Sequence, residues 1–171
     1  MSFLQTLLRR PFRPYFFALF ALVVFELCFG ALYLQGTLRL DPCPLCILQR
    51  YGLLAIGIVG LAGALHNRAP RLYGALITLA ALAGGGVAVW QSWLQANPAG
   101  IAACGPGIGR TVNGLAFAHW WPQLFEATGE CGAVDWTLLG LSIAHWGLVT
   151  FCGIIAVTLW LMLRRAPGAA R

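Results

Sequence analysis

The sequence predicts an all-α membrane protein: a bundle of four transmembrane helices with a short amphipathic interfacial helix in the second outer loop. Three observations lead to this fold class. Of the 171 residues, 60% are hydrophobic and only 9% are charged, whereas typical soluble domains carry about 25% charged residues. Four apolar segments are long enough to cross a membrane, and the arginines gather on one side of the resulting topology. This composition excludes a soluble enzyme, a disordered chain and a nucleic-acid-binding protein.

Four segments satisfy the length requirement, since a hydrocarbon core of about 30 Å needs roughly 17–25 helical residues. Within one membrane domain, residues 1–171, we expect spans at about 15–35, 46–65, 72–93 and 138–163. The first run is longer than the apolar core of a secretory signal peptide, about 7–15 residues, so we expect it to stay in the mature protein. Small residues at four-residue spacing, such as Gly60/Ala64 and Ala80/Gly84, favour close helix packing, although glycine and alanine are common in membrane helices generally.

The arginines orient the predicted bundle. The chain has eleven arginines and no lysine, and eight of them form three clusters: Arg9, Arg10 and Arg13; Arg68 and Arg71; Arg164, Arg165 and Arg171. Positively charged connections stay in the cytoplasm. Four crossings return both termini to the same side, so we expect cytoplasmic termini and outer loops at about residues 36–44 and 95–135.

The second outer loop contains a helical signal of its own. Apolar residues recur there at i, i+3, i+4, i+7 and i+8, which is one helical stripe: Phe117, Trp120, Trp121, Leu124 and Phe125. Asn113 is available as an N-cap. We expect a helix that lies flat on the membrane. The alternative is a helix packed against the bundle, because the polar face lacks the basic residues usual in interfacial helices.

The topology divides the six cysteines. Cys28 and Cys152 fall inside membrane segments, where a free cysteine behaves as a small buried hydrophobe. The other four lie on the outer side, where disulfides form and persist: Cys43, Cys46, Cys104 and Cys131. A four-cysteine zinc site usually presents two close-spaced pairs, and the second pair here is 27 residues apart, which disfavours a metal. Two inert structural disulfides remain an alternative to redox exchange.

A Cys-x-x-Cys motif, Cys43 to Cys46, stands where the chain enters its second membrane helix. Proline suits the first turn of a helix, so we expect the helix to begin near Pro44 and its partial positive charge to favour a thiolate at Cys46. Arg50 follows Cys46 by four residues, on the same helix face. Its cation would stabilise a thiolate or a developing anion on a bound ligand. Together with the second cysteine pair, this arrangement indicates a two-stage thiol–disulfide relay.

These residues resemble the disulfide bond formation protein B (DsbB) family, membrane oxidoreductases that use quinone to re-oxidise the periplasmic thiol oxidase DsbA. The resemblance runs from Glu26 to about Phe151. It rests on Cys43-Pro44-Leu45-Cys46 with Arg50, on Leu94-Gln95 leading to Cys104, on residues 122–131 (PQLFEATGEC), and on Trp136 followed by Leu139-Gly140-Leu141.

The resemblance implies a role for each outer cysteine. Cys104 and Cys131 would form a disulfide that a reduced DsbA-like partner attacks at Cys104, and the electrons would then pass to Cys43–Cys46. The Cys46 thiolate would deliver them to a membrane quinone, ubiquinone or menaquinone, beside Arg50. The resemblance also implies a multi-pass protein of the bacterial inner membrane, in contact with lipid and the quinone pool.

Two positions depart from the family pattern. Many relatives carry an acidic residue just before the arginine and a histidine near the outer end of the third helix, where this chain has Gln49 and Gln91. Gln91 is the candidate second quinone contact, as a hydrogen-bond donor to a carbonyl. Glu26 is either a proton-handling or a paired polar residue. The alternative functions are a relative serving another thiol oxidase and a non-catalytic membrane subunit whose outer loops are stapled by disulfides.

Overall fold

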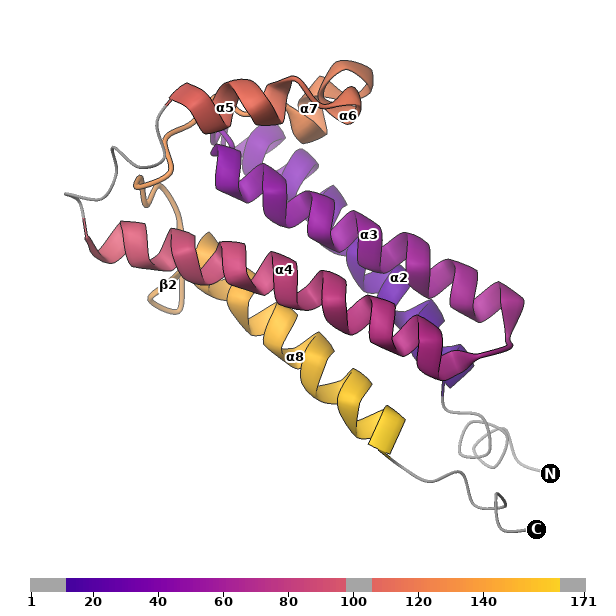
Figure 1. Cartoon of the computed structure of the whole chain (residues 1–171). Helices are drawn as coiled ribbons and strands as arrows, with labels where there is room; N and C mark the ends of the chain where they lie inside the picture. Colours follow the sequence, from indigo (N-terminus) through magenta and orange to yellow (C-terminus); the bar gives the residue numbers. More distant parts are fainter. Residues whose placement is uncertain (1–11, 98–105, 164–171) are drawn as a thin grey trace, which may run out of the picture.

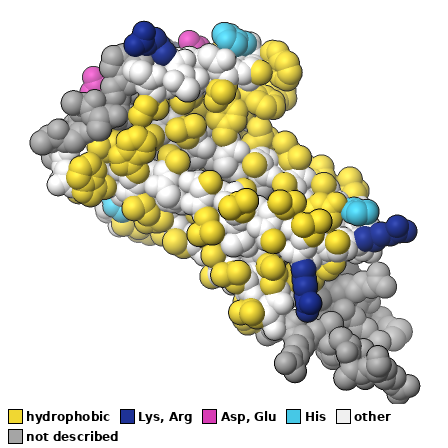
Figure 2. Space-filling model, viewed as in Figure 1, with side chains coloured by type: hydrophobic (Ala, Val, Ile, Leu, Met, Phe, Trp, Pro, Cys, Tyr) yellow, Lys and Arg dark blue, Asp and Glu magenta, His cyan; other side chains and the backbone are white. Residues whose placement is uncertain are grey.

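Four long helices lie alongside one another in the computed structural model, which describes residues 12–97 and 106–163 (Figure 1). They are long and apolar enough to cross a membrane, with spans Phe12–Thr37, Pro44–His66, Pro70–Ala96 and Ile143–Leu163. Exposed hydrophobic side chains cover their flanks (Figure 2). The predicted all-α, four-helix membrane fold is therefore confirmed.

The first span changes its winding partway along. α2 (Phe12–Cys28) continues without a break into a π-helix, η1 (Phe29–Thr37). π-Helical turns are rare and occur frequently at functional sites. Gly30 lies in this part of the span, and a Cβ atom there would come within 3.0 Å of Arg50 Nη2. The missing side chain at Gly30 thus leaves room for the guanidinium.

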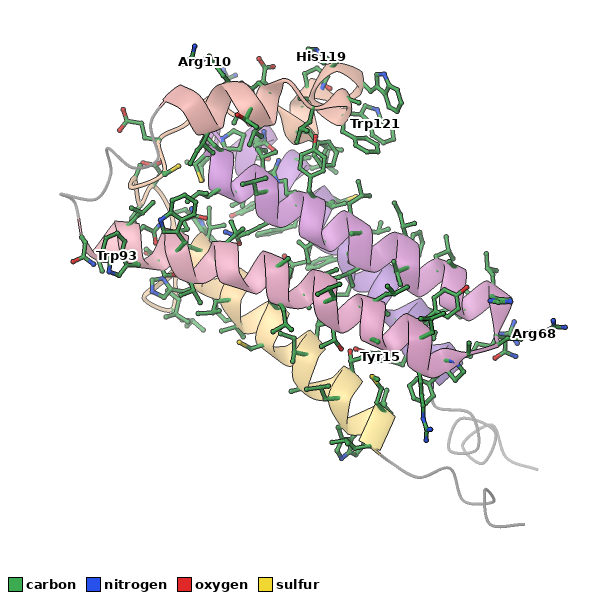
Figure 3. The ribbon with its side chains drawn as sticks, in the orientation of Figure 1. Tyr15, Arg68, Trp93, Arg110, His119 and Trp121 are labelled. Atoms are coloured by element: carbon green, nitrogen blue, oxygen red, sulfur yellow. The ribbon has the colours of Figure 1, made fainter. Side chains whose placement is uncertain are left out.

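The second and third spans each begin at a proline, which the sequence predicted for Pro44 alone. α3 (Pro44–His66) has Cys43 as its N-cap residue, in an extended conformation, and α4 (Pro70–Ala96) likewise starts with proline. Proline is favoured at the first helical position because that N–H has no intrahelical partner. The turn between the two helices passes through Asn67 at φ 48°, a left-handed C-cap. Arg68, in this turn, lies at the opposite end of the bundle from Arg110 and His119 (Figure 3).

Glycine brings the helices into close contact. A Cβ atom on Gly84 would overlap the ring of Phe151 in α8 (Ile143–Leu163), and a Cβ atom on Gly57 would come within 3.0 Å of Val23 in α2. Phe151 and Val23 both belong to the buried apolar core. The small residue predicted at position 84 therefore serves close packing of α4 against α8.

The fourth span begins five residues later than expected, at Ile143 instead of residue 138. The intervening residues form a two-stranded antiparallel hairpin, in which β1 (Thr137–Leu138) pairs with β2 (Leu141–Ser142). Leu139 and Gly140 connect the strands with φ of 54° and 79°. Two consecutive left-handed residues are typical of a type I′ hairpin turn, and they prevent a helix from continuing through this segment.

The single helix expected after Asn113 is divided into two short helices, α6 (Ala116–Trp120) and α7 (Pro122–Phe125), and a further helix, α5 (Pro106–Asn113), precedes them. They lie across one end of α3 (Figure 1). The break falls at Trp121, with φ −138° and ψ 71°, because proline disfavours helical geometry in the residue before it. Asn113 does not cap the predicted helix. It ends α5, and its side chain hydrogen-bonds Ala127.

The break also divides the predicted apolar stripe between two environments. The rings of Phe117 and Phe125 lie 6.0 and 4.9 Å from that of Tyr51 on α3. Trp120 and Trp121 are instead 72% and 60% exposed, and Trp121 lies at the side of the short helices, at the end of the molecule that carries Arg110 and His119 (Figure 3). One part of the stripe thus packs against the bundle, while the two tryptophans face outward.

Candidate active site

The Cys-x-x-Cys pair occupies the N-terminus of α3. Cys43 is only 3% exposed, and its sulfur accepts a hydrogen bond from the backbone N–H of Cys46 at 3.1 Å. Both cysteines are free thiols in this structure. The pKa of Cys43 is raised, first because its side chain hydrogen-bonds the Cys46 sulfur and second because burial disfavours a thiolate. Cys43 therefore keeps its proton in the reduced pair, which leaves Cys46 as the sulfur that can carry negative charge.

Arg50 is held beside the pair by groups from two other segments. Its Nη1 donates to Gln35 Oε1 in η1 and to the backbone carbonyl of Leu124 in α7, each at 2.7 Å. The guanidinium also interacts electrostatically with Cys46 and Cys43. The cation thus faces the sulfurs as the i, i+4 spacing suggested, and the outer loop contributes to its position.

Gln91 contacts both sulfurs directly. Its Nε2 lies 3.2 Å from Cys43 Sγ and 3.1 Å from Cys46 Sγ. Its Oε1 accepts a hydrogen bond of 2.6 Å from Gln49 Nε2. Both glutamines are buried. Gln49 and Gln91 are the two positions that depart from the family pattern. Their contact could not be predicted from the sequence, because the two residues lie on different helices.

A cavity of about 410 Å³ adjoins the sulfurs and takes its walls from all four spans and the β-hairpin. Its polar lining includes Glu26, Cys43, Cys46, Gln49, Arg50 and Gln91, and its apolar lining includes Phe29, Leu34, Leu53, Trp136 and Trp146. Glu26 accepts a hydrogen bond of 3.3 Å from Thr150 Oγ1, so the intramembrane carboxyl group is paired across helices. The volume and apolar walls are typical of a site for a small organic ligand.

Cys131 lies close to Cys43 in the fold. It is disulfide-bonded and buried, and it packs with Cys43, Leu45 and Leu94 in one apolar cluster. Cys104, its predicted partner, lies outside the described residues. The fold therefore brings three of the four predicted redox cysteines into one region.

The segment before Cys131 is fastened to the segment before Cys43. The backbone N–H groups of Thr128 and Gly129 donate to the carbonyl of Pro42 at 3.0 and 3.1 Å. Thr128 Oγ1 also donates to Asp41 Oδ1 at 3.1 Å. A side chain at Gly129 would overlap the Asp41 carbonyl, so glycine is needed for this close approach.

Sequence reasoning missed Gln35 and the Leu124 carbonyl. Gln35 offers a weak signal, because it is a polar residue near the outer end of an apolar span. A backbone carbonyl has no sequence signal, since every residue carries one. Both groups reach Arg50 only because η1 and α7 pack against α3.

Comparison with known proteins agrees with the geometry of the site. The model of the family "Disulfide bond formation protein DsbB" matches residues 13–161. The disulfide bond formation protein B of Azoarcus sp. (strain BH72) is 42% identical over 161 residues, covering 92% of this chain and 96% of that protein. The protein of the same name from Aromatoleum aromaticum is 44% identical over 159 residues, covering 91% and 95%. The chain therefore belongs to the DsbB family of disulfide bond formation proteins.

Proposed function

We propose that this protein re-oxidises a periplasmic DsbA-like thiol oxidase and passes the electrons to a membrane quinone, ubiquinone or menaquinone. One observation carries the proposal: a largely apolar cavity has the Cys43–Cys46 pair and the Arg50 cation in its wall. Membership of a family that forms disulfides supports the same conclusion. The protein would act as one membrane unit in the bacterial inner membrane, with both termini in the cytoplasm.

The first half of the relay is disulfide exchange in the outer loops. A thiolate of the reduced partner attacks Cys104 of a Cys104–Cys131 disulfide, forms a mixed disulfide and releases Cys131 as a thiolate. Cys131 then attacks Cys43 of the Cys43–Cys46 disulfide and releases Cys46. The shared apolar cluster of Cys43 and Cys131 supports this order of transfer.

The exchange is completed when each mixed disulfide is resolved. The second thiol of the partner attacks the bond to Cys104, which leaves the partner oxidised. Cys104 then attacks the Cys131–Cys43 bond, which restores the outer disulfide and leaves Cys43 as a thiol. Two electrons have moved from the partner to the Cys43–Cys46 pair, and no other oxidant is needed.

The second half transfers these electrons out of the protein. Quinone, when bound, supplies an acceptor for two electrons and two protons. The residues of this chain fit it, because the cavity has apolar walls and a cation at the sulfurs. Cys46 supplies the electron-rich sulfur, Arg50 stabilises negative charge beside it, and Cys43 supplies the thiol that closes the disulfide again. Gln91 is the proposed second polar contact.

The test combines both half-reactions. The full-length protein in lipid nanodiscs is mixed with a reduced DsbA-like protein and ubiquinone, and quinone absorbance and partner thiols are followed together. We expect one quinone reduced for each partner disulfide formed, and equal rates in a Cys28→Ser/Cys152→Ser control. Stable outer disulfides without thiol-dependent quinone reduction would instead identify a stapled, non-catalytic subunit. Turnover with a different thiol oxidase alone would identify a dedicated relative.

A further inference from the structure

Residues from three helices form a chain of contacts that ends at the two sulfurs. Gly147 of α8 lies against Gln49 Oε1 of α3, at a point where a methyl group would overlap that oxygen. Gln49 Nε2 donates to Gln91 Oε1 of α4 at 2.6 Å. Gln91 Nε2 then reaches Cys43 Sγ at 3.2 Å and Cys46 Sγ at 3.1 Å. The sulfurs are thus connected to the packing of α8 through two amide groups.

The chain of contacts fixes which end of each amide faces which neighbour. A glutamine side chain has one acceptor oxygen and one NH₂ group with two donors. Because Gln49 donates to the oxygen of Gln91, the NH₂ group of Gln91 is turned toward the sulfurs and has one hydrogen for each. In the reversed orientation, Gln91 would present an oxygen to the sulfurs and repel a thiolate.

Donors at the sulfurs act differently on the two redox states. A thiolate is an anion, and hydrogen bonds to a charged acceptor are stronger than those to a neutral one. A disulfide sulfur carries no charge and gains less from the same donors. Stabilising the reduced form of a dithiol makes its disulfide a stronger oxidant. The amide group itself does not titrate between pH 5 and 9, so it does not compete for the proton of the pair.

We propose that Gln91 is a catalytic residue that stabilises the reduced Cys43–Cys46 pair, and that Gln49 is a positioning residue that acts on the sulfurs through Gln91. In this step the disulfide takes up two electrons from the partner thiols and one proton, giving a Cys43 thiol and a Cys46 thiolate. The inference rests on the proposed redox role of the pair, but it does not depend on the identity of the quinone or the partner.

The test measures the reduction potential of this pair alone. The full-length chain with Cys104→Ala and Cys131→Ala is equilibrated with mixtures of reduced and oxidised dithiothreitol, and free thiols are trapped with a maleimide and counted by mass. We expect Gln91→Met to change the equilibrium constant about tenfold toward the disulfide, which lowers the midpoint by about 30 mV. Gln49→Met should shift it in the same direction by less.

A double-variant cycle separates positioning from a general structural effect. If Gln49 acts through Gln91, Gln49→Met should cause no further shift in the Gln91→Met background. The double variant also removes a buried donor and acceptor together, which is close to neutral for folding, so the test survives if a single variant misfolds. Gln95→Met is the matched control: Gln95 lies one turn further along α4 and bonds Ser142 and Ala133, and its loss should leave the midpoint unchanged.

Two results would overturn the inference. Equal midpoints in the wild type and the double methionine variant would show that the amides do not stabilise the reduced pair. Equal shifts from Gln49→Met with and without Gln91 would show that Gln49 does not act through it. The proposed function fails in a distinguishable way: the wild type would then reduce no quinone with the reduced DsbA-like protein, while the dithiothreitol titration would still give a midpoint for the pair.

Discussion

The two ends of the bundle are built from the same helices but are packed differently. Where α2 begins and α8 ends, the helices meet through aromatic rings and glycine: a Cβ atom on Gly63 would come within 2.9 Å of the Phe16 ring and 3.0 Å of the Tyr73 ring. At the other end, a cavity of about 410 Å³ remains. Hydrogen bonds join helices at both ends, as between Tyr15 and Thr158 at the first, but at the second end they line the cavity, where they join Gln49 to Gln91 and Glu26 to Thr150.

The difference shows how one fold combines stability with an open site. Apolar contacts at the first end, which we call the closed end, bury Phe16, Leu19 and Ile77 almost completely. Polar groups in a membrane need partners because no water is available to them. At the second end, which we call the cysteine end, Gln49, Gln91 and Glu26 find these partners in one another, at the sulfurs and in Thr150. We therefore expect changes at the cysteine end to affect reactivity more than stability, and changes at the closed end to do the reverse.

The largest expected effect is on reactivity alone and leaves stability unchanged. Cys46→Ser should abolish quinone reduction, because the sulfur beside Arg50 is removed, while the thermal unfolding temperature stays close to that of the wild type. Quinone absorbance and a thermal melt of the nanodisc sample measure the two properties. Thiol exchange in the outer loops should survive. Continued quinone turnover in this variant would remove Cys46 from its proposed role.

A second large effect concerns the sulfur at which the partner enters. Cys131→Ser, which leaves Cys104 free, should accumulate a mixed disulfide with the oxidised soluble partner, whereas Cys104→Ser should not. Local charge argues the other way: Glu130 next to Cys131 disfavours a thiolate there, so Cys104 would be the better leaving group. We expect access to favour Cys104, because the sequence after it is rich in glycine, whereas Cys131 is buried. Non-reducing gels of the two variants show which cysteine forms the mixed disulfide. A complex trapped through Cys131 would show that leaving-group chemistry prevails.

Arg50→Ala should have an intermediate effect at the cysteine end. Hydrogen bonds to charged groups contribute about 1.5–3 kcal/mol, so the quinone concentration for half-maximal rate should rise roughly tenfold or more. Arg50→Lys should do less harm, because the charge is kept although the planar fork is lost. Steady-state kinetics at several quinone concentrations measure this. An unchanged concentration dependence in Arg50→Ala would leave the arginine only a role in topology or packing.

The sequence predicted the four spans well because their signals are local. Length, hydropathy and, for the second span, the proline at residue 44 located the helices to within a few residues. The errors arose where backbone geometry overrides an apolar pattern. Pro122 interrupts the stripe that begins at Phe117, and the left-handed turn at Leu139 and Gly140 delays the last helix.

The candidate site could be predicted only in part, because only some of its contacts join residues that are close in the sequence. The Cys-x-x-Cys motif and Arg50 are close in the sequence, so their arrangement follows from helix geometry. Gln91 was predicted as a quinone contact, and that role stays a prediction. Its contacts with Gln49 and the sulfurs depend on how α3 and α4 pack, and no spacing along one segment encodes them.

The smallest predicted effects come from one added methyl group at each of two contacts between helices, one apolar and one polar. Gly84→Ala should destabilise the protein by about 1–3 kcal/mol, the usual cost of overpacking, because the added methyl overlaps the Phe151 ring. The midpoint of the Cys43–Cys46 pair should not change. Gly86→Ala is the matched control on the same helix, since a Cβ atom there meets nothing within 4 Å.

Gly147→Ala should give the opposite result. Its methyl group meets Gln49 Oε1, a side-chain atom that can move aside, so we expect stability to fall by less than in Gly84→Ala. The displaced Gln49 no longer holds the Gln91 amide in place, so the midpoint should become more negative, by less than in Gln91→Met. Gly153→Ala is the matched control on α8, because a Cβ atom at Gly153 meets nothing within 4 Å. It should change neither the stability nor the midpoint. If Gly147→Ala lowered the melting temperature as much as Gly84→Ala and left the midpoint unchanged, the contact of Gly147 with Gln49 would be a packing contact like that of Gly84 with Phe151, and the cysteine end would have no special effect on reactivity.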